Sequence, residues 1–130
     1  MLETGKPTVM VVDDHDDARE MMRVMLERRG YRVLEAGDGR AALATASAGR
    51  PDLILMDLSL PVLGGLDAAR LIRANASLRD VPLVAVTGYD RADFYQEARG
   101  AGYDEYLTKP FVFAEVEAIL RRLCPPPALA

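Results

Sequence analysis

The chain has 130 residues, half of them hydrophobic and 28% charged, which is the size and balance of one globular domain. Its formal net charge of −4 provides no basic excess, so we expect no direct nucleic-acid binding. The only cysteine is Cys124, which excludes an internal disulfide. There is no apolar run of transmembrane length and no signal-peptide pattern, so we expect a cytoplasmic protein without membrane insertion.

Short apolar segments alternate along the chain with amphipathic or alanine-rich segments. The short apolar segments predict buried strands, and the longer periodic segments predict helices. The predicted strands are 9–12, 31–36, 53–56, 83–86 and 103–107, and the predicted helices are 15–29, 40–48, 66–75, 91–99 and 113–123. In the first helix we interpret a methionine-rich face, with Met21, Met22 and Met25, as packing against the sheet.

Five strand–helix pairs in succession predict the α/β class. Parallel strands joined by right-handed crossovers give a single doubly wound (βα)5 flavodoxin-like domain with a five-stranded parallel sheet. Strands that are apolar throughout fit this fold, because helices cover both faces of a parallel sheet. We expect the domain to span residues 1–124, followed by a proline-rich tail at 125–130.

Polar and charged side chains stand where the predicted strands end. Asp13 and Asp14 follow the first strand, Asp57 the third, Thr87 the fourth and Lys109 the last. Because the carboxyl ends of parallel strands meet at one crevice, we expect these five side chains to lie close together.

The mutual repulsion of three carboxylates in one crevice must be offset by a proton or a cation. At ~4 Å separation and an effective dielectric of ~20, each like-charged pair costs about 4 kcal/mol, so either a carboxyl is protonated or a cation binds. With no His or Cys expected near the carboxylates, a hard cation is favoured, and Mg²⁺ fits best, with Mn²⁺ as a substitute.

Each of these residues also has an ordinary structural interpretation. Asp13 and Asp14 could cap a helix, and Thr87 and Lys109 could be plain strand-end residues. We interpret His15, the only histidine, as the first residue of a helix and not as a ligand or phosphodonor. The joint arrangement, rather than any one residue, favours a binding site.

The motifs at these strand ends resemble the receiver domain of two-component response regulators. The resemblance extends over residues 7–123 in order and spacing, and it is carried by four segments: 11–14 (VVDD), 55–65 (LMDLSLPVLGG), 87–88 (TG) and 106–111 (YLTKPF). A departure is Gly64, where the family commonly has an acidic residue, and we expect a more flexible loop there.

The resemblance implies a signalling phosphoacceptor rather than an enzyme that acts on a separate substrate. Asp57 would accept a phosphoryl group from a histidine kinase or a phosphotransfer protein. Mg²⁺ would be held by Asp14 directly, by Asp13 mainly through water, by Asp57, and by the backbone carbonyl of Ser59. Lys109 would pair with the phosphoryl oxygens.

The resemblance also implies a conformational switch and residues that set the lifetime of the phosphoryl group. Thr87 would bond a phosphoryl oxygen, and Tyr106 would turn inward when Thr87 moves. Ser59 and Tyr89 would flank the path of the hydrolytic water, with Ser59 permitting dephosphorylation and Tyr89 slowing it.

Aromatic and apolar residues suggest an output surface. Phe94, Tyr95, Val112 and Phe113 exceed what the sheet can cover. With Tyr106, we expect them to form an exposed face on segments 91–99, 103–107 and 113–123, for a downstream protein or for self-association.

Three other functions are compatible with a similar scaffold. A flavin-mononucleotide protein would need a phosphate cradle after the first strand, where Asp13 and Asp14 would repel the phosphate. An aspartate-nucleophile phosphatase would have a D-x-D motif there instead of adjacent aspartates. The third alternative is a degenerate receiver that acts only as a protein-binding module.

Overall fold

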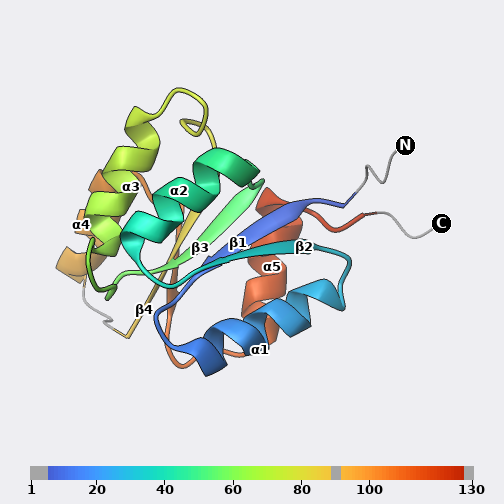
Figure 1. The fold of residues 1–130 in the computed structure, drawn as a ribbon. Coiled ribbons are helices and arrows are strands. Elements are labelled where there is room, and N and C mark those ends of the chain that lie inside the picture. The colour runs from blue at the N-terminus through green and yellow to red at the C-terminus, as the bar shows by residue number, and fades with distance from the viewer. Residues whose placement is uncertain (1–5, 89–91, 128–130) are drawn as a thin grey trace.

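The computed structural model describes residues 6–88 and 92–127, and these form a single sheet with helices on both faces (Figure 1). The strands are β1 (Thr8–Val12), β2 (Arg32–Ala36), β3 (Leu53–Asp57), β4 (Leu83–Thr87) and β5 (Glu105–Thr108). All neighbouring strands are parallel, in the order β2-β1-β3-β4-β5. The predicted (βα)5 flavodoxin-like fold is therefore confirmed.

Five helices cover the sheet: α1 (Asp16–Glu27), α2 (Gly39–Gly49), α3 (Gly65–Ala74), α4 (Ala92–Ala101) and α5 (Phe113–Leu123). Alternate side chains of each strand point to opposite faces. On β1, Val9 and Val11 pack in the cluster beneath α1 and α5, whereas Met10 and Val12 pack in the cluster beneath α2, α3 and α4. Both faces of the sheet are thus buried, which explains why the strands are apolar throughout.

Two strands extend one residue further than their apolar runs. Asp57 is the last residue of β3, and Thr87 is the last residue of β4; they are 5% and 0% exposed. Sequence reasoning placed both just beyond the strands, because a polar residue normally marks the end of a buried run. The sheet hydrogen bonds include them, so that backbone pairing fixes both residues.

The ends of α1 and of β5 also differ from prediction. His15 has extended backbone angles (φ −92°, ψ 113°) and is the N-cap of α1, and the helix ends at Glu27, before Gly30 (φ +94°). The fifth strand begins at Glu105 rather than at residue 103. Tyr103 lies before it, with its buried hydroxyl donating to the carbonyl of Gly65 (2.8 Å).

The methionine-rich face of α1 is only partly packed. Met22 packs against the core beneath α1 and α5, but Met21 is 65% exposed. The packing interpretation is therefore wrong for Met21, because the apolar stripe of α1 is wider than the surface that the sheet offers it.

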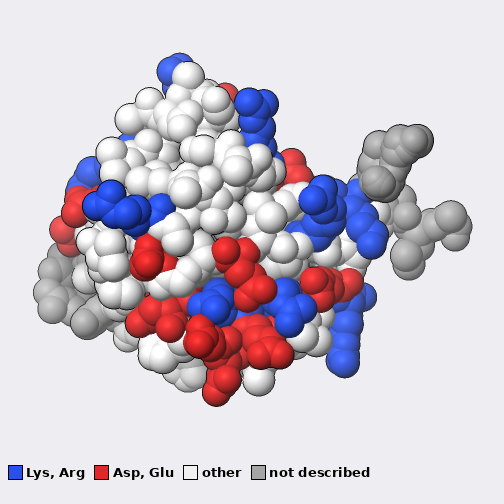
Figure 2. All heavy atoms as spheres, in the orientation of Figure 1, with Lys and Arg blue, Asp and Glu red and all other residues white. Residues whose placement is uncertain are grey.

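The exposed charges of α1 and β2 are interleaved rather than segregated by sign, and Figure 2 shows the acidic and basic side chains alternating on this face. Arg19 and Arg23 both pair with Glu35 of β2, each at 3.1 Å. Within the described residues, no helix is long and apolar enough to cross a membrane. The cytoplasmic location and the domain limits at 1–124 and 125–130 stay predictions.

Candidate functional site

The sheet topology brings Asp13 and Asp57 side by side. β1 and β3 are neighbours at the centre of the sheet, with Val12 paired to Met56. Asp13 follows Val12 and Asp57 follows Met56, so the two carboxylates lie at adjacent strand ends on the same edge of the sheet. Asp14 and His15 continue from Asp13 into the first turn of α1.

Asp57 is a buried carboxylate with a partner on each oxygen. Its Oδ1 accepts from the backbone N–H of Ser59 (2.8 Å), and its Oδ2 accepts from Nζ of Lys109 (2.9 Å). These two donors compensate the burial of the charge, which would otherwise be strongly unfavourable. They also fix the direction in which each oxygen points.

Lys109 reaches Asp57 from the end of β5. Its backbone N–H donates to the carbonyl of Thr87 (2.7 Å), and its peptide bond to Pro110 is cis. Burial lowers the pKa of the Lys109 ammonium, but the hydrogen bond to Asp57 and the charges of Asp57, Asp13 and Asp14 outweigh burial, so that the pKa is raised above its usual value. The lysine is therefore a permanent cation at neutral pH.

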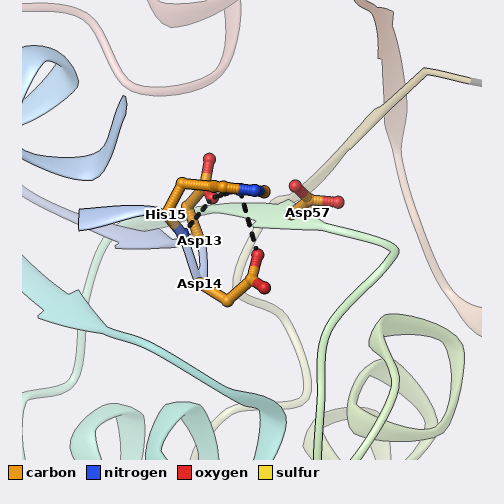
Figure 3. Close-up of side chains that lie close together, drawn as sticks. All are labelled: Asp13, Asp14, His15 and Asp57. Atoms are coloured by element: carbon orange, nitrogen blue, oxygen red, sulfur yellow. Dashed lines mark hydrogen bonds and ion pairs between the residues drawn. The ribbon is translucent and has the colours of Figure 1, made fainter. Parts of the chain in front are cut away.

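Three carboxylates and an imidazole converge at this edge. One ligand atom from each of Asp13, Asp14, His15 and Asp57 lies within 4.8 Å of all the others. Figure 3 shows the ring of His15 beside the carboxylates of Asp13 and Asp14 and directed toward Asp57. Carboxylate oxygens at this spacing suit a divalent cation such as Mg²⁺.

The expectation that no histidine lies near the carboxylates is wrong. His15 Nδ1 is 3.2 Å from Oδ1 of Asp13 and 3.2 Å from Oδ1 of Asp14. Oδ1 of Asp13 also accepts from the backbone N–H of His15 (2.9 Å), a local turn that folds the chain back over the crevice. The Asp-x-His spacing could have signalled this turn, but it does not specify which way the ring points.

Thr87 and Tyr106 lie on adjacent strands near this edge. Thr87 is completely buried at the end of β4, and it pairs in register with Thr108 of β5. The half-buried ring of Tyr106 meets the ring of Tyr95 from α4 in an edge-to-face contact with 4.9 Å between centroids. Tyr89 lies outside the described residues, and Ser59 is exposed.

The expected apolar face is only partly assembled. Tyr95 and Val112 are 39% and 65% exposed, and Phe94 is half-buried against the core beneath α4. Phe113 does not belong to this face, because it packs on the opposite side of the sheet with the guanidinium of Arg29 4.5 Å from its ring centroid. Adjacent residues at the start of a helix point in different directions, so Val112 and Phe113 separate.

A pocket of about 90 Å³ opens beside Asp57. Its polar end is formed by Asp13, Asp57 and Lys109, and its apolar wall includes Met22 of α1 and Phe111 of the β5–α5 loop. The Asp57 carboxylate thus lies in a small cleft between α1 and the chain that follows β5.

The segment that runs from the β3–α3 loop into Gly65, the first residue of α3, packs tightly against the backbone of Asp57 and Leu58. A Cβ atom on Gly65 would lie 2.7 Å from Cα of Leu58 and 2.8 Å from the carbonyl oxygen of Asp57, whereas a Cβ on Gly64 would meet nothing within 4 Å. In the same loop Val62, which is 70% exposed, has a φ of +68°, a region that β-branched residues rarely adopt. The expected flexibility at Gly64 is not tested by these contacts.

Comparison with known proteins places the chain in a family. The family model described as the response regulator receiver domain matches residues 9–121. Among curated relatives, the phosphate regulon transcriptional regulatory protein PhoB of Pseudomonas aeruginosa is 37% identical over 122 residues, covering 91% of this chain and 53% of PhoB. The DNA-binding response regulator MtrA of Mycolicibacterium smegmatis is 36% identical over 127 residues, covering 93% and 54%. The chain spans about half the length of the curated relatives it matches.

Solved structures agree on the fold. The receiver domain of the sensor histidine kinase PA1611 from Pseudomonas aeruginosa, with a magnesium ion coordinated in its active-site cleft, superimposes with a TM-score of 0.84 at 38% identity and covers 91% of this chain and 97% of that chain. The chemotaxis protein CheY4 of Vibrio cholerae gives a TM-score of 0.86 at 31% identity, with 91% and 98% covered.

The relatives overturn one expectation about partners. The expectation of no nucleic-acid partner, based on the net charge of −4, is wrong, because the matching relatives include a DNA-binding response regulator and several transcriptional regulatory proteins. These 130 residues cover about half the length of each such relative. Their net charge therefore says nothing about the part of each relative that this chain does not cover.

The family model covers most of the chain, and the fold and the order of motifs agree with it. The chain therefore belongs to the response regulator receiver domain family.

Proposed function

We propose that this domain accepts a phosphoryl group on Asp57, in a reaction that requires Mg²⁺ or Mn²⁺, from a phosphohistidine of a histidine kinase or phosphotransfer protein. The observation that carries the proposal is the arrangement around Asp57. Both of its oxygens are held by donors, at 2.8 and 2.9 Å, and the carboxylates of Asp13 and Asp14 lie beside it.

The transfer is a displacement at phosphorus. A carboxylate oxygen of Asp57 forms the new bond to phosphorus while the bond from phosphorus to the donor's imidazole nitrogen breaks, and the imidazole leaves with the bonding pair. Phosphoryl transfer depends mainly on positioning and on neutralising charge over the equatorial oxygens. A divalent cation held by Asp13, Asp14 and Asp57, with the Ser59 carbonyl as a further ligand by family resemblance, would supply positive charge there.

Lys109 and Thr87 respond to the product. Before transfer, Lys109 neutralises the Asp57 carboxylate; after transfer, the charge to be neutralised lies on the phosphoryl oxygens, and the ammonium would follow it. The Thr87 hydroxyl, at the end of the adjacent strand, would donate to another phosphoryl oxygen. These two movements would form a local electrostatic trigger for a two-state change.

The output surface in this proposal is the α4–β5–α5 face with Tyr106 at its centre. Its exposed members are Tyr95 and Val112, and Phe94 supports them from the core side. An inward turn of Tyr106 would break its edge-to-face contact with Tyr95 and change the face that a downstream protein or a second copy meets. The similarity to a DNA-binding response regulator also supports DNA as a partner. Ser59 and Tyr89 stay the predicted determinants of phosphoryl lifetime.

Phosphorylation with a small-molecule donor tests the proposal. Incubation with radiolabelled acetyl phosphate is expected to label the wild type only when Mg²⁺ is present, and Asp57→Asn is expected to abolish the label. Asp14→Ala should lose both the label and Mg²⁺ binding. Lys109→Ala should leave Mg²⁺ binding while the response of Tyr106 to beryllofluoride is lost.

The outcomes separate the alternatives. A label that survives Asp57→Asn, or that does not require Mg²⁺, would refute the assignment. No label, together with retained binding to a kinase, would indicate a degenerate receiver. Steady turnover of p-nitrophenyl phosphate would indicate a phosphatase, and a yellow purified protein would indicate a flavin site.

A further inference from the structure

Among the four described residues whose ligand atoms cluster at the crevice, His15 is the one that the proposed function does not use. The donors that the proposed function assigns to the cation are all oxygens, from three carboxylates and the Ser59 carbonyl, and oxygen donors alone favour hard ions such as Mg²⁺. An imidazole nitrogen adds a borderline-soft donor, which suits Zn²⁺, Ni²⁺, Co²⁺ and Cu²⁺. The identity of residue 15 therefore bears on which cations this site prefers.

We infer that His15 is a specificity-determining residue of the cation site, where its Nδ1 acts as an additional protein donor and increases the affinity for transition metals relative to Mg²⁺. The inference rests on the cation site of the proposed function. It concerns the preference among cations and requires no phosphoryl transfer.

The distances within the cluster support this role. Two donor atoms that bind one ion at about 2.1 Å, with angles between right and tetrahedral, are about 3.0 to 3.4 Å apart. His15 Nδ1 lies 3.2 Å from an oxygen of Asp13 and 3.2 Å from an oxygen of Asp14. His15 Nδ1 is thus already at the spacing of a neighbouring ligand from each of the two oxygens.

The backbone holds His15 in place to provide this donor. The N–H of His15 donates to Asp13 Oδ1 (2.9 Å), and Nη1 of Arg19 donates to the backbone carbonyl of Asp13 (2.8 Å). His15 is also the N-cap of α1, so its main chain is anchored to the helix although its side chain makes no cap hydrogen bond. The side chain is 72% exposed, so its loss should not disturb packing.

Metal affinities of matched variants test the inference. Isothermal titration calorimetry at one fixed pH would be done with Ni²⁺ and with Mg²⁺ on the tag-free wild type, His15→Ala, His15→Gln and Asp14→Asn. His15→Ala and His15→Gln are expected to weaken Ni²⁺ binding at least tenfold and to change Mg²⁺ binding less than twofold. Asp14→Asn is expected to weaken both ions.

A spectroscopic readout identifies the donor atom. Because the chain has a single histidine, long-range ¹H–¹⁵N spectra report one imidazole, and Zn²⁺ is expected to shift its Nδ1 resonance while Mg²⁺ does not. Unchanged Ni²⁺ affinity in His15→Ala, equal losses for both ions, or an unmoved Nδ1 would each overturn the inference. Those results would leave the proposed function intact as long as Asp14→Asn still weakens Mg²⁺. Failure of the wild type to bind either ion would overturn the cation site and this inference together.

Discussion

Two adjacent glycines at the start of α3, the N-cap Gly64 and the first helical residue Gly65, are expected to respond in opposite ways to the same added methyl group. In Gly65→Ala the new Cβ would lie 2.7 Å from Cα of Leu58 and 2.8 Å from the Asp57 carbonyl oxygen. Ordinary carbon contacts are about 3.5 to 4.0 Å, so the backbone at Asp57 must shift by roughly 0.8 Å or more. Both obstructing atoms belong to the main chain, and no side-chain rotation can relieve the overlap.

The expected loss of stability in Gly65→Ala follows from overpacking. Forcing extra methyl groups into a packed interior costs about 1 to 3 kcal/mol. Since the obstruction is backbone, we expect about 2 kcal/mol or more for Gly65→Ala, which lowers the melting temperature by roughly 6 to 10 °C in a domain of this size. In Gly64→Ala the methyl meets nothing within 4 Å, and φ −66° with ψ 161° suits alanine. That variant is expected to be unchanged or more stable by about 0.4 to 1 kcal/mol, because its unfolded chain is less flexible.

Two measurements are needed. Urea denaturation followed by circular dichroism gives the free energy of unfolding, and titration with beryllofluoride in Mg²⁺ reports whether Asp57 is still correctly placed. Gly65→Ala should weaken beryllofluoride binding, and Gly64→Ala should not. Equal stability of the two variants, or a larger loss for Gly64→Ala, would refute the packing argument.

Three further changes test other parts of the fold. Val62 is 70% exposed at φ +68°, where an L-residue costs roughly 1 to 2 kcal/mol, so Val62→Asn should raise the unfolding free energy in urea by about 1 kcal/mol, and Val62→Thr, which is also β-branched, should not. Asp38 is the N-cap of α2 and accepts from the N–H of Ala41 (2.7 Å), so Asp38→Ala should lose about 1 kcal/mol in the same assay, and a comparable loss in Asp38→Asn would contradict this capping role. Burial raises the pKa of Tyr31 to about 12, and its hydroxyl donates to the carbonyl of Cys124. An unfolded tyrosine ionises near pH 10, so the unfolded state loses this proton first and stability should fall as the pH rises from 10 toward 12. Unfolding measured from pH 9 to 11 should show a shallower decline in Tyr31→Phe, and an identical decline would show that Tyr31 does not contribute.

The sequence predicts the sheet and the convergence of its polar residues because both depend on strong, short-range patterns. Short apolar runs that end in Asp13, Asp57 and Thr87 and alternate with helical segments are typical of buried parallel strands, and parallel strands bring their carboxyl ends together. The order of motifs then suffices to suggest the family.

The details that escape prediction depend on side-chain direction and loop geometry. The ring of His15 turns toward Asp13 and Asp14 because of a local hydrogen-bonded turn. The sequence gives the identity of residue 15 but not the rotamer of its side chain. The predicted start of α5 at residue 113 is correct, but Phe113 packs beneath Arg29 while its neighbour Val112 is exposed, because successive side chains at a helix start point about 100° apart. The positive φ of Val62 has no compositional signal, since β-branched residues normally avoid it.

The position of β1 between β2 and β3 also has a consequence for folding. Asp13 and Asp57 become neighbours only when two strands from distant parts of the chain pair, and Lys109 then reaches Asp57 from 52 residues away. Such non-local pairing is slow to form, and no fragment of the chain contains the complete crevice. A ligand of the crevice therefore binds the native state and not the unfolded chain, so each tenfold excess over its dissociation constant adds about 1.4 kcal/mol to stability. Occupancy of the crevice and the free energy of unfolding are in this way thermodynamically coupled.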